Sequence, residues 1–311
     1  MTSGGSQRVT VTEVRARKRR GPPLVMVTAY DHPSATNADA AGIDLVLVGD
    51  TAAMTVLGYP GTEPVTFEEM LVLGRAVRRG LSRALMIGDL PMGSYEASDS
   101  AAVTSAQRLV KETGCDAVKL EGAGTSVDRL RAITAAGVVT IGHLGLTPQR
   151  RASLGGFRTQ AKTALAAVRL RDDALALQDA GCFALVLEAV PAPVAAMVTR
   201  RLEIPTIGIG AGPDCDGQVL VYNDLLGYHS NLQPRFVKRY ADFGTLARNA
   251  LRTFATEMRD GRFPSVEHCY ELSEEELQSA RAISLTDPAL LARRGTALNS
   301  GRACAGRTGP A

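Results

Sequence analysis

The sequence contains no tryptophan, and aromatic residues make up only 5% of its 311 residues. Proteins that read single-stranded nucleic acid by base stacking need more aromatic rings than this. The five cysteines are scattered, with no C-x-x-C pair and no spacing typical of a metal site. An odd, scattered set of cysteines is typical of reduced thiols in the cytoplasm. We therefore expect a cytoplasmic protein without a nucleic-acid partner.

The sequence also lacks a long uninterrupted apolar run. Its longest apolar stretch, residues 180–198, contains Glu188, Pro191 and Pro193. A membrane-spanning helix needs about 20 apolar residues without such breaks. No apolar segment follows the first basic residues, so no secretory signal is predicted. We expect no membrane partner.

Charge is nearly balanced over the whole chain, with 35 basic and 32 acidic residues, but the basic excess lies at the two ends. Residues 1–23 alone carry a net charge of +5, and residues 15–20 form a basic run. Such a run could contact phosphates. We interpret it instead as the solvated face of a helix.

Short apolar runs recur along the chain, and most are separated by segments with helical periodicity. Uninterrupted runs of this kind are typical of parallel strands buried on both faces. Eight runs predict an α/β fold, a (β/α)8 TIM barrel with additional C-terminal helices, and a doubly wound open sheet is the alternative. Only 13 residues separate the starts of the last two runs, which leaves no room for a full helix. The runs are residues 24–29, 45–49, 84–88, 117–120, 138–142, 184–188, 206–210 and 219–222.

Helix boundaries are indicated by capping patterns. Thr66-x-x-Glu69 has the form of a capping box. Three glycines stand where helices are expected to end, the last of them after a predicted helix over residues 160–180. These glycines are Gly114, Gly137 and Gly181. Residues 243–260 predict an amphipathic helix, and Ser273-x-x-Glu276 indicates the start of another.

We divide the chain into a basic N-terminal segment (1–23), a barrel with C-terminal helices (24–270) and a C-terminal segment (271–311). In the last segment, a short helix precedes a tail from about residue 284. The tail has no periodicity and is predicted to be disordered.

Polar side chains follow or end the apolar runs. In a parallel barrel these run ends lie on one face, the face that carries active sites. We therefore expect one pocket to gather six charged or ionisable side chains from separate parts of the sequence. They are Asp50, Asp89, Lys119, Glu121, His143 and Glu188.

Each of these residues also has a purely structural interpretation. Asp50 could cap a helix, Lys119 and Glu121 could form a structural ion pair, and His143 could hold a loop. Against this, two Asp and a Glu without His or Cys form a hard oxygen site that suits Mg²⁺. Burial of Glu188 would favour a general base, because burial raises the pKa of a carboxyl group. Mg²⁺ would polarise the keto group of a 2-oxoacid, and the base would then form an enolate.

Ten sequence blocks, in order, resemble the ketopantoate hydroxymethyltransferase family over roughly residues 8–270. The most telling are VGDT…M (48–54), DLPMGSY (89–95), AVKLEG (117–122), GHLGLTPQ (142–149) and IGIGAG (207–212). Ten blocks are far more specific than a single motif. Residues 10–21 also resemble the opening strand and helix of this family.

The resemblance implies a TIM barrel that uses Mg²⁺ and assembles as a homo-oligomer, typically a homodecamer. It implies transfer of a hydroxymethyl group from 5,10-methylenetetrahydrofolate to 3-methyl-2-oxobutanoate, which gives 2-dehydropantoate for pantothenate and coenzyme A biosynthesis. By motif, Asp50, Asp89 and Glu121 bind the metal. Thr51, Lys119 and His143 contact the substrate together with the two aspartates, and Glu188 is the catalytic proton acceptor.

The sequence departs from the family pattern at three positions. Thr51 replaces a serine, Ala53 a glycine and Met92 a phenylalanine. We expect these residues to line the pocket, and Ala53 to matter if its backbone needs a positive φ. These departures leave open a paralogue with the same chemistry on another 2-oxoacid. A Mg²⁺-dependent oxoacid lyase or mutase is a further alternative, because it would use a similar metal-chelated enolate.

Overall fold

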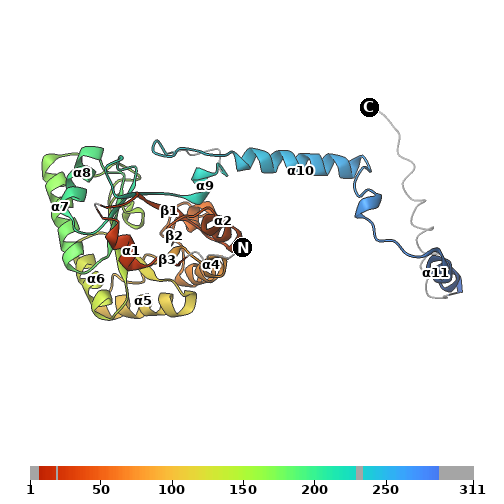
Figure 1. Cartoon of the computed structure of the whole chain (residues 1–311), viewed down its shortest axis with the longest axis horizontal. Helices are drawn as coiled ribbons and strands as arrows, with labels where there is room; N and C mark the ends of the chain where they lie inside the picture. The colour runs from red at the N-terminus through yellow and green to blue at the C-terminus, as the bar shows by residue number, and fades with distance from the viewer. Residues whose placement is uncertain (1–6, 19, 229–233, 287–311) are drawn as a thin grey trace, which may run out of the picture. The chain divides into compact units, whose positions relative to one another are not determined.

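The computed structural model describes residues 7–18, 20–228 and 234–286. The chain divides into two compact units, residues 1–246 and residues 247–311 (Figure 1). This division falls inside a helix, 24 residues before the boundary that we place at residue 270 from the sequence. The three segments inferred from the sequence stay a prediction.

The first unit is a closed barrel of eight parallel strands in sequential order, as the apolar runs predict. Alternate residues face inward and outward, so that Leu85 and Ile87 fill the barrel while Met86 faces the helices. The strands are β1 (Leu24–Thr28), β2 (Leu45–Val48), β3 (Leu85–Asp89), β4 (Ala117–Glu121), β5 (Thr140–Gly145), β6 (Ala184–Glu188), β7 (Thr206–Ile209) and β8 (Gly217–Leu220).

Strands β5 and β8 differ from the predicted runs. Strand β5 continues to Gly145, because its last residues pair with β6. Strand β8 begins at Gly217, two residues before the predicted run, because it closes the barrel between β1 and β7. Only glycine fits at this point, since a Cβ there would lie 2.5 Å from the carbonyl oxygen of Leu24.

Helices follow most strands, and the predicted capping signals are confirmed. Thr66 caps α4 in a capping box with Glu69, and Gly114 ends α5 in the left-handed conformation. In the described residues no helix separates β7 from β8. The helices of this unit are α1 (Val11–Ala16), α2 (His32–Ala40), α3 (Ala52–Thr55), α4 (Phe67–Gly80), α5 (Asp99–Thr113), α6 (Thr125–Ala135), η1 (Pro148–Arg150), α7 (Ala164–Asp179), α8 (Ala192–Arg201) and α9 (Tyr222–Leu225).

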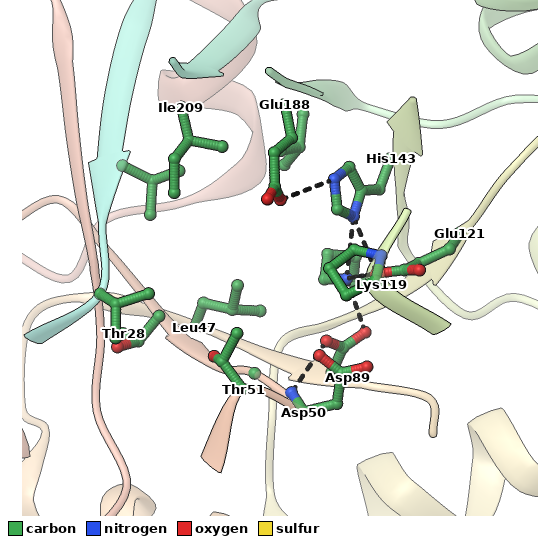
Figure 2. A pocket seen from close by; sticks show the side chains of 15 residues that line it. Thr28, Leu47, Asp50, Thr51, Asp89, Lys119, Glu121, His143, Glu188 and Ile209 are labelled. Carbon is green, nitrogen blue, oxygen red and sulfur yellow. Dashed lines mark hydrogen bonds and ion pairs between the residues drawn. The ribbon is translucent and has the colours of Figure 1, made fainter. Parts of the chain in front are cut away.

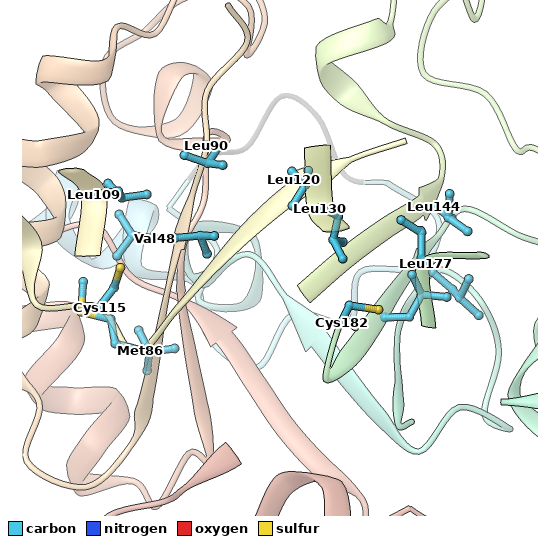
Figure 3. Close-up of a cluster of buried hydrophobic side chains, with 14 of the residues drawn as sticks. Val48, Met86, Leu90, Leu109, Cys115, Leu120, Leu130, Leu144, Leu177 and Cys182 are labelled. Carbon is cyan, nitrogen blue, oxygen red and sulfur yellow. The ribbon is translucent and has the colours of Figure 1, made fainter. Parts of the chain in front are cut away.

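Two apolar layers hold the barrel together. The larger layer lies between the strands and the surrounding helices, where Figure 3 shows Met86, Leu109 and Cys115 in one group and Leu144, Leu177 and Cys182 in another. The second layer fills the barrel interior. With both faces of the sheet buried, the polar strand-end residues are left at the rim of the barrel.

The N-terminal segment closes the bottom of the barrel, at the N-terminal ends of the strands. Helix α1 places Val14 in the interior layer. Of the strand and helix expected over residues 10–21, only the helix is present among the described residues, and Thr10 already caps it. Just before it, the backbone N–H of Val9 donates a single hydrogen bond to the carbonyl oxygen of Arg83. A lone bond of this kind extends no ladder, so the strand prediction is wrong.

The basic run is more than a solvated helix face, and that interpretation is wrong for Lys18. Its side chain is buried, with Nζ 2.8 Å from Asp216 Oδ2 and 2.8 Å from the carbonyl oxygen of Thr199. Arg17 pairs with Asp44 at 3.0 Å. These pairs tie α1 to the loops that precede β2 and β8, which gives the run a structural role.

Helix α10 (Phe243–Arg259) crosses into the second unit, which also contains η2 (Val266–His268) and α11 (Glu274–Thr286). Both predicted helices are confirmed, and Ser273 accepts a hydrogen bond from the backbone N–H of Glu276. Helix α11 continues two residues past the predicted start of the disordered tail, and residues 287–311 lie outside the described part. Throughout the described chain, every helix is too short or too polar to cross a bilayer.

Candidate active site

All six ionisable residues singled out from the sequence line one small cavity at the C-terminal end of the barrel (Figure 2). We call it the barrel cavity, and its volume is about 40 Å³. Thr51 lines it as well. The prediction that strand ends gather these side chains at one place is confirmed.

The strand register explains why the side chains meet. Asp89 on β3 pairs with Lys119 on β4, and Glu121 on β4 pairs with His143 on β5. Paired residues of neighbouring parallel strands point to the same face at the same height. Glu188 is the last residue of β6. Four neighbouring strands thus deliver five polar side chains to one mouth.

Lys119 lies at the centre of this group. Its Nζ is 2.9 Å from Asp89 Oδ1, 3.4 Å from Glu121 Oε1 and 3.3 Å from His143 Nδ1. Burial lowers the pKa of Lys119, but Asp89 and Glu121 outweigh it, and the net shift is upward. Lys119 is therefore a fixed positive charge rather than a nucleophilic amine.

His143 joins two carboxylates. Its Nδ1 lies 3.1 Å from Glu121 Oε1, and its Nε2 lies 3.2 Å from Glu188 Oε2. Burial and the Lys119 charge lower the pKa of His143. Glu121 and Glu188 raise it by more than this, so that the net pKa is about 9. These distances place a protonated His143 ring between the carboxylates of Glu121 and Glu188.

Asp50 and Asp89 lie side by side on the other flank of the cavity. The backbone N–H of Asp50 donates to Asp89 Oδ2 at 3.1 Å. Burial, together with the charges of Asp89 and Glu121, holds the pKa of Asp50 well above its usual range. Asp50 does not cap a helix, because the residue at the start of α3 is Thr51. Its carboxylate is thus available to a ligand.

Gln149 is a site residue that our sequence interpretation missed. Its Nε2 donates to Asp50 Oδ2 at 3.0 Å, and its backbone N–H donates to Glu121 Oε2 at 3.1 Å. The phenol of Tyr95 donates to its side-chain oxygen at 2.7 Å. Gln149 is buried, and its place at the end of the GHLGLTPQ block was the available signal in the sequence.

The donor set fits a divalent cation between Asp50 and Asp89. Four carboxylates line the cavity, and only Lys119 and a protonated His143 oppose them. Burial raises the pKa of both aspartates, and the neighbouring carboxylates raise that of Asp50 further, while Lys119 offsets part of the rise at Asp89. Carboxylate oxygens are the ligands that Mg²⁺ prefers.

Glu121 is oriented differently from the two aspartates. One of its oxygens faces Lys119 and His143, and the other accepts the N–H of Gln149. In the part of the chain that the structure describes, no three His, Cys, Asp or Glu side chains converge closely enough to hold a metal alone. A metal here would keep water ligands, and the ligand role of Glu121 stays a prediction.

Glu188 is less buried than its apolar run suggests, since its side chain keeps 16% exposure. Figure 2 shows it across the cavity from Asp50 and Thr51. A carboxylate that faces the cavity from the far side can reach a substrate held by the aspartates.

Of the three unusual residues, only Thr51 lines the barrel cavity. Thr51 contributes to the barrel cavity, and its Oγ1 lies 2.7 Å from Tyr30 Oη. Ala53 is buried in the helix-facing layer with an ordinary helical backbone, and Met92 is 50% exposed. Our expectation that all three line the pocket is wrong for Ala53 and Met92, because α3 turns Ala53 toward the core.

Comparison with known proteins agrees with these observations. Residues 8–266 match the family described as ketopantoate hydroxymethyltransferase. The chain belongs to this family. It is 51% identical to 3-methyl-2-oxobutanoate hydroxymethyltransferase 1, mitochondrial, of Arabidopsis thaliana, over 88% of this chain and 80% of that protein. It is 52% identical to 3-methyl-2-oxobutanoate hydroxymethyltransferase of Moorella thermoacetica, over 85% of this chain and 98% of that protein.

The fold of this family member is shared with a solved structure of phosphonopyruvate hydrolase in complex with oxalate and Mg²⁺. The TM-score is 0.54 at 16% identity, over 89% of this chain and 98% of that one. At this identity the likeness shows the fold alone. The roughly 50% identity to hydroxymethyltransferases favours the transferase over the lyase or mutase alternative.

Proposed function

We propose that the chain transfers a hydroxymethyl group from 5,10-methylenetetrahydrofolate to 3-methyl-2-oxobutanoate and yields 2-dehydropantoate, a precursor in pantothenate biosynthesis. One observation carries the proposal: the carboxylate of Glu188 faces a pair of buried aspartates across a small cavity at the end of the barrel. Family membership supports it.

Asp50 and Asp89 would hold Mg²⁺, with Glu121 as the third residue implied by the family resemblance. The ion would supply positive charge to the keto and carboxylate oxygens of the substrate and so acidify the carbon beside the keto group. The solved phosphonopyruvate hydrolase of the same fold contains Mg²⁺ together with oxalate, a small dicarboxylate.

The rest of the cavity suits the remainder of the substrate. Lys119 provides a fixed positive charge near Asp89 for a substrate oxygen. The opposite wall is apolar and takes the branched alkyl group, because burial of methyl groups against such a wall is favourable. Its residues are Leu47, Val186, Ile209 and Val219. The extra methyl of Thr51 narrows this small cavity, which keeps the paralogue alternative open.

Glu188 takes the proton from C3 of the oxoacid, and His143 holds the carboxylate in place. A bond forms from C3 to the methylene carbon of the donor, and the bonds from this carbon to the folate nitrogens break. Water supplies the hydroxyl oxygen. The C3 proton and one water hydrogen end on the two nitrogens, so that tetrahydrofolate leaves and the atoms balance.

We also propose self-association, with the homodecamer implied by the resemblance as the expected assembly. Helix α10 supports this, because it exposes large apolar side chains that a monomer would leave in water. They are Leu246, Leu251, Phe254 and Met258, each at least 46% exposed. The cytoplasmic location expected from the cysteines is likewise a proposal, and the name of the Arabidopsis relative places that protein in mitochondria.

The proposed function is tested with Glu188→Gln, which keeps the shape of the side chain and removes the base. We expect oxoacid binding within about twofold of wild type and a loss of at least about 100-fold in C3 proton exchange with deuterium oxide. Glu68→Gln, on the exposed surface of α4, is the matched control and should exchange normally. Exchange at the wild-type rate in Glu188→Gln would assign the base to another residue.

A companion assay identifies the substrate. The purified protein is incubated with methylenetetrahydrofolate, with and without Mg²⁺, and with several 2-oxoacids in turn. Product masses then show which acid gains the hydroxymethyl group. A product from another 2-oxoacid alone would favour the paralogue.

A further inference from the structure

A second, larger cavity adjoins the barrel cavity and takes no part in the chemistry above. Its volume is about 330 Å³, and we call it the outer cavity. Its lining comes from the loop after β1 and from α2, α3 and α9, all within the barrel unit. Tyr30 lines the outer cavity, and Thr51, hydrogen-bonded to it at 2.7 Å, lines the barrel cavity. One hydrogen-bonded pair thus contributes a side chain to each of the two linings.

The difference in volume between the two cavities indicates that they hold ligands of different size. The barrel cavity, at about 40 Å³, has room for a few small groups and none for a bicyclic ring. A reaction between a small oxoacid and a large one-carbon carrier therefore needs a second space within reach of the first. The outer cavity is such a space.

The aromatic side chains of the outer cavity offer a stacking surface. The rings of Tyr222 and Tyr228 stack with centroids 6.3 Å apart. Phe243 supports Tyr228 from the edge at 5.4 Å. Tyr228 is 40% exposed and lines the outer cavity, so part of its ring is accessible to a ligand there. Offset stacking of a flat ring on this face is favourable.

The polar side chains of the outer cavity are mostly acceptors. Asp31 caps α2 through Oδ1, which accepts the N–H of Ser34 at 2.8 Å, and it has no cationic partner among the described residues. The amides of Asn37 and Asn223 donate to Tyr222 Oη and to the carbonyl oxygen of Thr55. Their amide oxygens receive no hydrogen bond from the described chain, and so remain acceptors.

This lining selects against anions and for a ring that carries N–H donors. Among the described residues no Lys or Arg lines the outer cavity, and Asp31 adds a negative charge, so a second oxoacid or a phosphate would be repelled. A carboxylate accepts two parallel hydrogen bonds from an N–C–N edge, as it does from a guanidinium group. An aminated heteroaromatic ring combines such an edge with a flat face.

We propose that the outer cavity binds the pterin ring of the one-carbon carrier, with Tyr228 stacking on the ring and Asp31 accepting from its N–H edge. This rests on the proposed function, which requires a folate donor. The carrier's methylene group would reach the substrate past Tyr30 and Thr51.

The test is calorimetric titration of the full-length protein with 6-methyltetrahydropterin, which has the ring and lacks the folate tail. Asp31→Asn keeps the helix cap, because asparagine caps as well as aspartate, and removes the charge. Tyr228→Leu removes the aromatic face and keeps an apolar side chain. The matched controls are Tyr228→Phe, which keeps the face, and Asp128→Asn, which removes an exposed charge on α6.

We expect Asp31→Asn and Tyr228→Leu each to weaken tetrahydropterin binding by roughly tenfold or more, and both controls to bind as wild type does. Affinity unchanged in Asp31→Asn and Tyr228→Leu would overturn the inference, as would simple competition between tetrahydropterin and the oxoacid. C3 proton exchange uses only the barrel cavity and is measured in parallel. Its absence in the wild type would count against the proposed function, while the titration would still decide the ring site.

Discussion

His143 Nε2 lies 3.2 Å from Glu188 Oε2, in a ring whose other nitrogen is held by Glu121. The imidazole therefore connects the proposed base to the charged group around Lys119. The ring is held through Nδ1, and its Nε2 lies next to the Glu188 carboxylate. We therefore propose that His143 is a positioning residue for the base.

Replacement of His143 by glutamine should remove the connection between Glu188 and the charged group around Lys119. We expect C3 proton exchange to slow by about 10- to 100-fold, as is typical when an outer partner of a site residue is lost. The KM for the oxoacid should change much less, because Lys119 and the two aspartates stay in place. His268→Gln, at an exposed position, is the control. Wild-type exchange in His143→Gln would remove the positioning role.

Asp50→Asn should uncouple stability from Mg²⁺. Without metal, we expect the melting temperature to stay equal or to rise by a few °C, because burial and the charges of Asp89 and Glu121 disfavour an ionised carboxylate at this position. In wild type, added Mg²⁺ should raise the melting temperature steadily with concentration, since a ligand that binds only the folded state stabilises it. The variant should lose this response, as thermal scans over a Mg²⁺ series will show. An unchanged Mg²⁺ response would exclude Asp50 as a ligand.

Lys18→Met should destabilise the protein without changing its chemistry. Lys18 and Asp216 form a buried ion pair at the end of the barrel opposite the active site. Loss of Lys18 should lower the free energy of unfolding by about 2–3 kcal/mol. This is less than for a fully buried pair, because Asp216 is partly exposed. The melting temperature should fall by about 5 °C or more, with kcat unchanged at a temperature where the variant is folded. Arg15→Met, at an exposed position of α1, should show neither effect, and equal stability of both variants would contradict the role given to Lys18.

We expect Asp39 to make a pH-dependent contribution to the free energy of unfolding. Its carboxylate accepts hydrogen bonds from the backbone N–H groups of residues 82–84 and from the hydroxyl of Ser82. Burial raises the pKa of Asp39, but these hydrogen bonds outweigh it and lower the pKa to about 2. A lowered folded-state pKa means that the stabilisation is complete above the ordinary value near 4 and is lost as the pH falls through 2.

Asp39→Asn should therefore be less stable than wild type at pH 7, by about 1 kcal/mol after allowance for solvent screening. The difference should shrink below pH 4 and vanish near pH 2. Urea denaturation midpoints at pH 7, 4 and 3 measure it. Asp179→Asn, on the exposed side of α7, is the control, and a difference that persists unchanged at pH 3 would contradict the assignment.

The sequence by itself determined the barrel and the six ionisable members of its site. Parallel strands buried on both faces appear in the sequence as uninterrupted apolar runs. The ends of such strands bring polar residues such as Asp89 and Glu188 to one rim, independently of the loop conformations. The capping box at Thr66 and the missing helix before β8 were likewise local signals. For these features, residue type and spacing are the physical cause.

Only the tertiary structure decided which side chains touch. The sequence predicts Lys18 to be a surface residue, but the fold places Asp216 beside it. The sequence likewise predicts Ala53 to line the pocket, but a short helix turns it toward the core. Gln149 and the outer cavity depend on loops from distant parts of the chain. Such contacts are set by the closure of the barrel, whose register no local pattern encodes, and so distances and charge pairing at the site had to come from the fold.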